Sequence, residues 1–330
     1  MKLVRYSAFG PPDTVLEVVE VPIPEPASSE VRIRVEASPI HLADLKHING
    51  VPWFDQYKPP YTPGYEGVGR VSAVGSAVQG VAEGDRVFLP VRFGAWAEEV
   101  IAPAQGLWMA PEAIDAVQLA LVPINFSTAY LMLREVVQLS PGDWVVQNAA
   151  NSNVGYYLIK LCRRWGLDSA NVVRRESALP ALEAAGGSKN FVDGADLSAQ
   201  VRAVIPPGKL KLAIDAVAGD ATARLASCFV DSGGVVLSYG MLSGDPCSIP
   251  PEMLMLDDVM LKGFYAARTI EQIGSAATSL MHEEINTCLV ESPPEAQIAA
   301  TYSYSDVREA VQHAARTESD REGKIVLVNE

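Results

Sequence analysis

Apolar residues recur with two different periods along the chain, and the first period covers roughly the first third. Residues 31–35 alternate between apolar and polar side chains, residues 67–75 form a strand-like run with glycines, and residues 83–89 combine a turn with a strand-like run. Alternation of apolar and polar residues with period two is typical of a half-buried strand. Many short strands separated by Gly/Pro turns favour a small barrel or sandwich. Residues 1–110 are therefore predicted to be β-rich.

The pattern changes near Asp115, after which apolar residues follow helical spacing to about residue 137. Short buried runs then alternate with helical patterns: strands at 144–147, 170–173, 191–192, 212–215 and 234–239, with a helix over 154–165. This alternation predicts a doubly wound parallel sheet of the Rossmann type. From about residue 271 a further helix and a terminal strand at 324–328 should return to the first domain. The predicted fold is α/β, with a β-rich domain (1–122 and 271–330) and a Rossmann domain (123–270).

Composition and charge narrow the function classes. The chain has 330 residues, too many for one ordinary core, and a formal net charge of −14, which disfavours binding to nucleic acid. We find no apolar run of the roughly 18 residues that a membrane helix needs, and no apolar core of a signal peptide near the start. A cytoplasmic location without membrane contact is expected. The four cysteines show no CxxC spacing, which disfavours a cysteine zinc cluster.

A candidate phosphate-binding turn follows the strand at 144–147. Residues 150–155 read Ala-Asn-Ser-Asn-Val-Gly, which keeps only the last glycine, Gly155, of the GxGxxG dinucleotide fingerprint. Ser152 occupies the position of closest approach, where its hydroxyl can donate to phosphate, and Asn153 tolerates a left-handed backbone. With Val154 these residues would open the helix whose N-terminus faces the pyrophosphate. A βα turn without a ligand remains the alternative.

Two arginines, Arg174 and Arg175, follow the second strand about twenty residues past the turn. Enzymes that use NAD place Asp or Glu at this point, whereas arginine accepts the 2′-phosphate of NADP. The pair therefore favours NADPH as the cofactor. A solvated basic turn is the alternative, and Glu176 lies one residue beyond the pair.

These residues, in this order, resemble the medium-chain dehydrogenase/reductase superfamily, and most of all its zinc-free 2-enoyl thioester reductase branch, with quinone oxidoreductases as relatives. The segments that carry the resemblance are GYEGVGRVSAVGS, INFSTAYLML, GDWVVQNAANSNVG, NVVRR, GGVVLSYGML and LKGFY. The resemblance implies that the β-rich domain is GroES-like and that the protein is a homodimer. It also implies the residues that bind NADPH: Asn125, Ser152, Asn153, Val154, Gly155, Arg174, Arg175, Tyr239, Gly240, Met241, Phe264, Tyr265, Ala266 and Lys324. Tyr239 and Phe264 are equally compatible with a role as plain core residues.

The zinc ligands of the superfamily's alcohol dehydrogenases are not retained. Matched to that pattern, the chain has His41 at the first ligand position, Tyr65 at the second and Ile124 at the third. One imidazole cannot make a zinc site, which needs three protein ligands and an open position. No metal is expected, and His41 is interpreted as a residue of the substrate pocket or of the core.

Without zinc, the expected reaction is hydride transfer to an activated C=C bond, assisted by a proton donor. In the resembled family a loop tyrosine is the donor, but its position falls here on Pro52 or Trp53. The candidate catalytic residues are therefore Tyr57, Tyr61, Trp53 and His41. The two tyrosines are equally compatible with packing, and Trp53 with stacking on a flat substrate.

Three functions stay open from the sequence. The first is an NADPH-dependent reductase of 2-enoyl thioesters, and the second is a reductase of quinones or α,β-unsaturated carbonyl compounds. The third is a sensor that binds NADPH without catalysis. The altered tyrosine position keeps the second and the third open.

Overall fold

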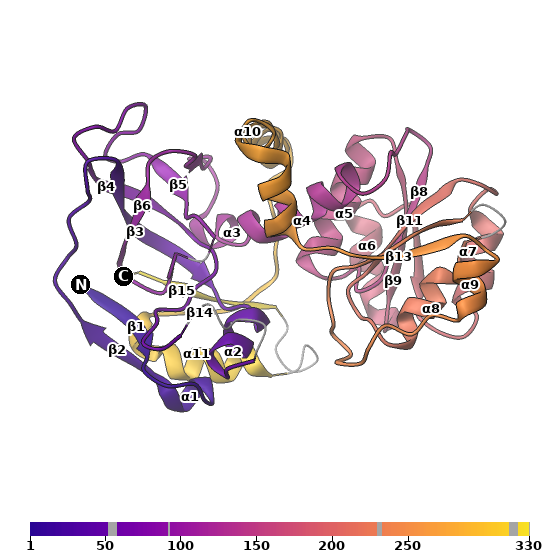
Figure 1. Ribbon diagram of the computed structural model, residues 1–330, viewed down its shortest axis with the longest axis horizontal. Helices are drawn as coiled ribbons and strands as arrows, with labels where there is room; N and C mark the ends of the chain where they lie inside the picture. The colour runs from indigo at the N-terminus through magenta and orange to yellow at the C-terminus, as the bar shows by residue number, and fades with distance from the viewer. Residues whose placement is uncertain (52–57, 92, 230–232, 317–322, 330) are drawn as a thin grey trace. The chain divides into compact units, whose positions relative to one another are not determined.

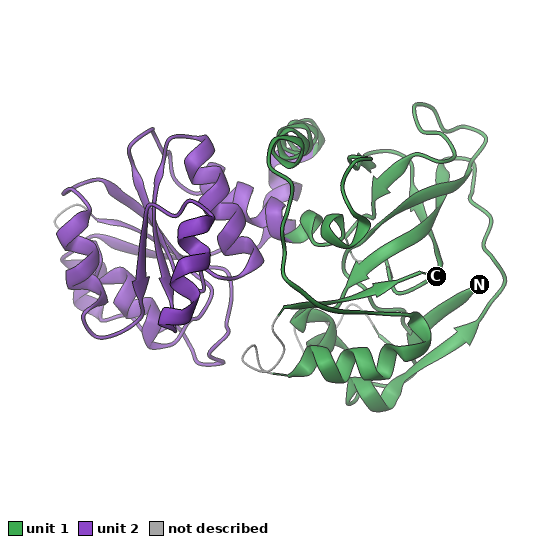
Figure 2. Cartoon of the chain, turned by 180° about the vertical axis from the view of Figure 1, so that it is seen from behind, with its two compact units in different colours: residues 1–124, 275–330 green, residues 125–274 purple. Residues whose placement is uncertain are grey.

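The computed structural model describes residues 1–51, 58–91, 93–229, 233–316 and 323–329, which form two compact units. Unit 1 comprises Met1–Ile124 and Ser275–Glu330, and unit 2 comprises Asn125–Gly274 (Figure 2). The two units hold a Rossmann sheet and a β-rich sheet, which confirms the predicted fold class. Within the described ranges no helix is long and apolar enough to cross a membrane.

Unit 1 is built on a long central strand, β3 (Glu30–Pro39), whose apolar residues alternate inward as the sequence predicts. It pairs antiparallel with β4 (Val68–Val74), β6 (Glu99–Pro103) and β15 (Lys324–Val328). The sheet continues to β5 (Arg86–Phe88) and β7 (Trp108–Met109) at one end, and to β14 (Ile298–Tyr302) at the other. The terminal strand β15 is thus part of the sheet that the N-terminal segment forms (Figure 1).

Shorter elements complete unit 1. The hairpin of β1 (Lys2–Tyr6) and β2 (Leu16–Glu20) encloses the one-turn helix α1 (Pro12–Val15). Helix α11 (Val307–Ala315) packs beside α1 and against β15, and α2 (Leu42–Ile48) follows β3. Two short 3₁₀ turns, Glu176–Ala178 in unit 2 and Tyr304–Asp306 in unit 1, precede longer helices.

Unit 2 is a parallel sheet in the order β10-β9-β8-β11-β12-β13. The strands are β8 (Trp144–Gln147), β9 (Asp168–Val173), β10 (Lys189–Val192), β11 (Leu210–Asp215), β12 (Gly234–Ser238) and β13 (Val259–Gly263). The third, second, first, fourth, fifth and sixth strands along the chain lie side by side in that order. This is the doubly wound order in which ligands bind outside the carboxyl ends of the strands.

Helices cover both faces of this sheet. Val172 of β9 packs in a cluster with α7 (Leu197–Val204) and α8 (Asp220–Ala226), whereas Val173 packs with α5 (Asn153–Arg164) and α6 (Leu179–Ala184). Successive side chains of a strand point to opposite faces, so the two helix groups lie on opposite sides. The predicted helix over 115–137 is divided into α3 (Ala116–Leu119) and α4 (Val122–Arg134).

A long helical segment, α10 (Ala266–Glu291), carries the chain out of unit 2, and it begins earlier than the expected residue 271. Gly274 interrupts it with a non-helical backbone at φ 77°. In unit 1 its last turns are fixed by Trp108, whose indole stacks on His282 with ring centroids 4.1 Å apart and donates to Asn286. The remaining helix, α9 (Pro251–Met255), is short and precedes β13.

Candidate functional site

Most of the predicted cofactor residues of unit 2 follow strands at one edge of its sheet, whereas Asn125 lies on α4. Because the strands run parallel, the residues that follow β8, β9, β12 and β13 all lie at the carboxyl edge. Arg174 follows β9, Tyr239 follows β12 and Phe264 follows β13. The order of connections reverses between β8 and β11, so this edge contains the switch point of the sheet.

The turn after β8 ends at Ser152, which is the N-cap of α5. Its Oγ accepts the backbone N–H of Gly155 at 3.1 Å. A side chain at Gly155 would clash with the carbonyl of Ala150, which explains why the last glycine of the fingerprint is kept. The left-handed residue of this turn is Ala149 at φ 48°, and Asn153 is helical, unlike the backbone role expected for it.

The first turn of α5 offers hydrogen-bond donors that suit an anionic ligand. The side-chain Nδ2 of Asn153 is buried and, among the described residues, has no hydrogen-bond partner. A buried amide donor without a partner is costly, and it here lies at the positive end of a twelve-residue helix. Phosphate oxygens would satisfy both features.

Tyr239 is tied to the same turn. Its hydroxyl shares a hydrogen bond with the Ser152 side chain, while burial raises the pKa of the phenol above its usual range. The next residue, Gly240, leaves no room for a side chain because Ala216 lies against it. The other predicted contacts differ in exposure: Asn125 and Val154 are buried, whereas Arg174, Arg175, Met241 and Tyr265 are exposed.

A buried polar network stabilises this edge of the sheet. The sequence did not predict it. Asp215, at the end of β11, accepts Asn148 Nδ2 at 2.7 Å and Thr222 Oγ1 at 2.6 Å, as well as the backbone N–H groups of Val217 and Ala218. Asn148 in turn accepts the N–H of Ala216 at 2.8 Å. The network ties β8 to β11 across the switch point. The available signal was a polar residue directly after one buried strand, Asn148, and an acidic residue at the end of another, Asp215.

Unit 1 places His41 at the N-cap of α2, bound to Glu66. His41 Nε2 lies 2.6 Å from Glu66 Oε1, and Glu66 Oε2 accepts the N–H of Ile124 at 2.6 Å. His41 also forms a reciprocal capping box with Asp44, whose carboxylate accepts the N–H groups of His41 and Gly64. Burial raises the pKa of Asp44 to about 6. His41 and Ile124, two of the three positions matched to zinc ligands, thus both bind the carboxylate of Glu66.

Tyr61 belongs to an aromatic cluster. Its backbone pairs with that of Tyr6 in both directions, and its ring lies 5.1 Å from the ring of His47. Tyr6 in turn shares a hydrogen bond of 3.0 Å with His47, which is almost fully buried. Trp53 and Tyr57 lie outside the described residues. Lys324 begins β15 and is half-buried.

A metal site does not form among these groups. Within the described parts of the chain, no set of three or more His, Cys, Asp or Glu side chains is arranged to hold a metal ion. His41 faces one carboxylate, Glu66, and the cysteines nearest in sequence lie in unit 2.

Comparison with known proteins places these features in a class. Residues 27–112 match the alcohol dehydrogenase GroES-like domain. A structure from Bacillus thuringiensis, described as an NADPH:quinone reductase, superimposes with a TM-score of 0.89 at 28% identity and covers 100% of this chain and 99% of its own. A mitochondrial 2-enoyl thioester reductase heterodimer from Candida tropicalis has a TM-score of 0.86 at 24% identity, with 99% of each chain covered, and shows the shared fold. A GroES-like unit joined to a Rossmann unit defines the medium-chain dehydrogenase/reductase superfamily, and the enoyl and quinone reductase relatives place the chain in its zinc-free branch.

Sequence relatives narrow the class further. The mitochondrial enoyl-[acyl-carrier-protein] reductase of Dictyostelium discoideum is 32% identical over 82% of this chain and 79% of its own length. The enzyme of the same name from Caenorhabditis elegans is 33% identical over 80% and 76%. The chain belongs to the enoyl-[acyl-carrier-protein] reductase family.

The expected cytoplasmic location is wrong by this comparison. The relatives from Dictyostelium discoideum, Schizosaccharomyces pombe, Caenorhabditis elegans and Arabidopsis thaliana are all named as mitochondrial proteins. The expectation depended on the lack of a long apolar run, which identifies membrane-spanning chains, and of the apolar core that identifies a secretory signal. Such a criterion does not distinguish one aqueous compartment from another.

Proposed function

We propose that the protein is an NADPH-dependent reductase that transfers hydride to the activated C=C bond of a 2-enoyl thioester of coenzyme A or an acyl carrier protein. The main observation in support is that relatives 30–33% identical over about four fifths of the chain are named enoyl-[acyl-carrier-protein] reductases. The carboxyl edge of the Rossmann sheet adds the donors that a dinucleotide needs. The chain is an NAD(P)H-dependent oxidoreductase.

The chain's own groups suit NADPH in three places. The first turn of α5, with Ser152, Asn153, Val154 and Gly155, would hold the pyrophosphate through N–H groups and the Asn153 amide. Exposed guanidinium groups after β9 would pair with the 2′-phosphate. The remaining proposed contacts are Asn125, Tyr239, Gly240, Met241, Phe264, Tyr265 and Ala266 in unit 2, and Lys324 in unit 1.

The bound nicotinamide supplies the hydride, and the protein has to orient the acceptor and deliver a proton. Tyr61 is the described residue best suited to donate that proton, because its hydroxyl is an acid and its backbone is fixed by Tyr6. Tyr57 and Trp53 remain proposals for a donor and a stacking surface. His41 uses its side chain within unit 1, on Glu66 and in the capping box, which favours a supporting role.

Quinone or enone reduction is the second candidate. It is favoured by the Bacillus thuringiensis structure, which matches the whole chain and is described as an NADPH:quinone reductase. Both candidates share the cofactor and differ in the acceptor. The interpretation as a non-catalytic NADPH sensor is disfavoured, because the named relatives of the chain are enzymes.

The discriminating experiment follows NADPH oxidation with crotonyl-CoA, a benzoquinone and a simple enone under the same conditions. We expect kcat/KM for crotonyl-CoA to exceed the other two by at least about 100-fold, because the thioester handle contributes binding energy to the transition state. A higher value for the quinone would replace the first proposal by the second. No oxidation with any acceptor, despite tight NADPH binding, would refute both.

We also propose a homodimer formed through the outer edge of β13. This strand ends the sheet, and beside it Met255, Leu256 and Met260 expose 78%, 79% and 59% of their surface. An unpaired edge with exposed apolar side chains is suited to pairing with a second copy. Met260→Lys should convert the dimer to monomer in sedimentation experiments, whereas a monomeric wild type would refute the proposal.

A further inference from the structure

The carboxylate of Glu66 joins three segments of unit 1 that are distant in sequence. The residue is fully buried, and its two oxygens bind different partners, the imidazole of His41 and the backbone N–H of Ile124. Its own backbone carbonyl accepts Ser38 Oγ at 2.7 Å, so the main chain is fixed as well. The carboxylate is therefore held in one position from both sides.

The contact with Ile124 is a helix cap supplied from 58 residues away. Ile124 is the third residue of α4, and N–H groups in the first turn of a helix have no partner inside the helix. The preceding residue, Pro123, has no N–H group. A carboxylate at this end also interacts favourably with the helix dipole. Glu66 therefore fixes where α4 begins.

We propose that Glu66 is a positioning residue for hydride transfer, because it holds the first turn of α4 and with it Asn125, the residue next to Ile124. The inference depends on the proposed function, in which Asn125 contacts the nicotinamide. Asn125 is buried and lies in the same helical turn as the capped N–H group. The His41 imidazole orients the carboxylate by occupying its other oxygen.

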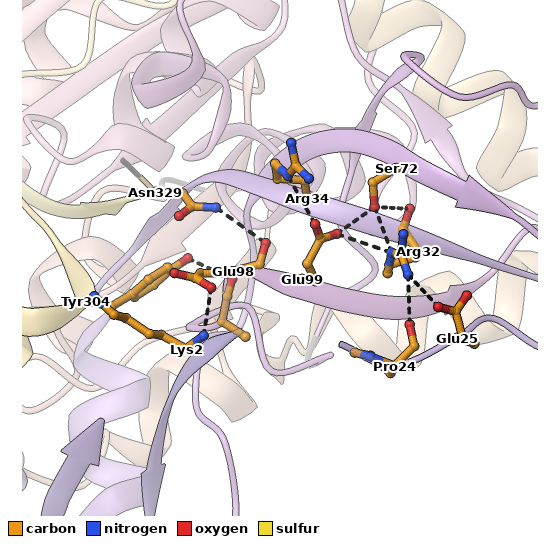
Figure 3. A network of polar contacts seen from close by, with 11 residues as sticks. Lys2, Pro24, Glu25, Arg32, Arg34, Ser72, Glu98, Glu99, Tyr304 and Asn329 are labelled. Atoms are coloured by element: carbon orange, nitrogen blue, oxygen red, sulfur yellow. Dashed lines mark hydrogen bonds and ion pairs between the residues drawn. The ribbon is translucent and has the colours of Figure 1, made fainter. Parts of the chain in front are cut away.

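Glu99 provides a matched control within unit 1. It is also a buried carboxylate, but it binds charged and hydroxyl side chains of the barrel: Arg34 at 3.0 Å, Ser72 at 2.6 Å and Arg32 at 3.7 Å (Figure 3). These partners lie on β3 and β4, in the seven-stranded sheet of unit 1. Loss of Glu99 thus tests the cost of losing a buried carboxylate without a change at α4.

The substitution Glu66→Gln keeps the shape and removes one acceptor. The amide has a single oxygen, so its NH₂ group must face a donor, either Ile124 N–H or the imidazole. If it faces the imidazole, the ring has to accept at Nε2 and donate at Nδ1, which opposes the capping box with Asp44. Either outcome loosens one end of the link between His41 and α4.

The test compares Glu66→Gln, Asn125→Ala, the double variant and Glu99→Gln, each saturated with NADPH. The first readout is the emission spectrum and lifetime of bound NADPH, which reports the nicotinamide environment without turnover. The second is kcat with crotonyl-CoA, together with the kinetic isotope effect from NADPH deuterated at the transferred position. The dissociation constant for NADPH and the melting temperature are measured in parallel.

We expect Glu66→Gln to alter the bound emission and to lower kcat about 10- to 100-fold, since a small misplacement of reacting groups has costs of this size. The isotope effect should rise, and the NADPH dissociation constant should change by less than about threefold. The double variant should resemble Asn125→Ala, because the effects of coupled residues are not additive. Glu99→Gln should match wild type in emission and isotope effect.

Opposite results would overturn the inference. Wild-type emission and isotope effect in Glu66→Gln, or equal changes in Glu99→Gln, would reduce Glu66 to a stability role. If Glu66→Gln does not fold, Ile124→Pro removes the capped N–H in a turn that tolerates proline, Ile124→Val serves as the control for the change of side chain, and only Ile124→Pro must reproduce the emission change. If wild type binds NADPH but reduces no enoyl thioester, the proposed function fails while the emission comparison still decides the role of Glu66.

Discussion

Removal of the two arginines after β9 should separate NADPH binding from NADH binding. Arg174→Ser/Arg175→Ser leaves the sheet intact, because both residues are exposed and β9 ends at Val173. The 2′-phosphate carries a charge of about −1.5 to −2 at neutral pH, and its attraction to one cation at about 4 Å in water is about 1 kcal/mol per unit charge. Two exposed cations therefore contribute about 3–4 kcal/mol before screening by salt and loss of side-chain entropy.

After those losses we expect about 2–3 kcal/mol, which corresponds to about 30- to 150-fold in the dissociation constant for NADPH. NADH affinity should change by less than about threefold, since NADH has no 2′-phosphate. The assay is fluorescence titration of both cofactors at low and high salt, where high salt should reduce the difference. Arg163→Ser/Arg164→Ser, which removes the same charge from the last turn of α5, is the control. Equal losses for both cofactors, or a control with the same loss, would refute the reasoning.

Three further predictions concern stability, the cofactor turn and the proton donor. Burial raises the pKa of Asp44 to about 6, so ionisation of this carboxyl opposes folding. As the pH falls from about 7.5 to about 4.5, the free energy of unfolding of wild type should rise by about 2 kcal/mol relative to that of Asp44→Asn. Urea unfolding measures this difference, and a difference that does not change with pH would contradict the prediction. Gly155→Ala should clash with the Ala150 carbonyl, cost about 1–3 kcal/mol and weaken NADPH binding; an unchanged melting temperature would argue against the close packing. Tyr61→Phe should lower kcat at least about tenfold with unchanged NADPH affinity, and unchanged rates in both Tyr61→Phe and Tyr57→Phe would discard the relocated donor.

The Rossmann unit could be predicted in detail because its signals are local. Each buried strand appears in the sequence as a short apolar run, and the residue after the run is placed at the carboxyl edge by the parallel topology. Arg174 was predicted as a cofactor contact from its place after a buried strand, whereas Tyr239 and Phe264 were expected from the family resemblance. In the structure all three residues follow parallel strands and therefore lie at the carboxyl edge. The residue after β8, Asn148, was overlooked although the same rule applies to it.

The missed contacts share a physical reason. The partners of Glu66 lie 25 and 58 residues away, and those of Asp215 include a side chain 67 residues away. Such pairs leave no periodic pattern, since each partner looks locally like an isolated polar residue in an apolar segment. What the sequence does contain is the burial itself: a charged residue inside a run that must be buried needs a partner. Glu66, two residues before the apolar start of β4 at Val68, had that signal.

The loss of zinc ligands and the presence of the Glu66 link are two aspects of one arrangement. In the zinc enzymes of the superfamily the three matched positions bind a cation, whereas here an imidazole and a backbone N–H at those positions bind an anion. A site that has exchanged a central cation for a central carboxylate no longer polarises a carbonyl as a Lewis acid, but it still fixes the segments around it. Reduction of a conjugated C=C bond needs positioned hydride and a proton, and both are compatible with such a site. The structural role of the metal position can thus persist in a family whose chemistry does not use the metal.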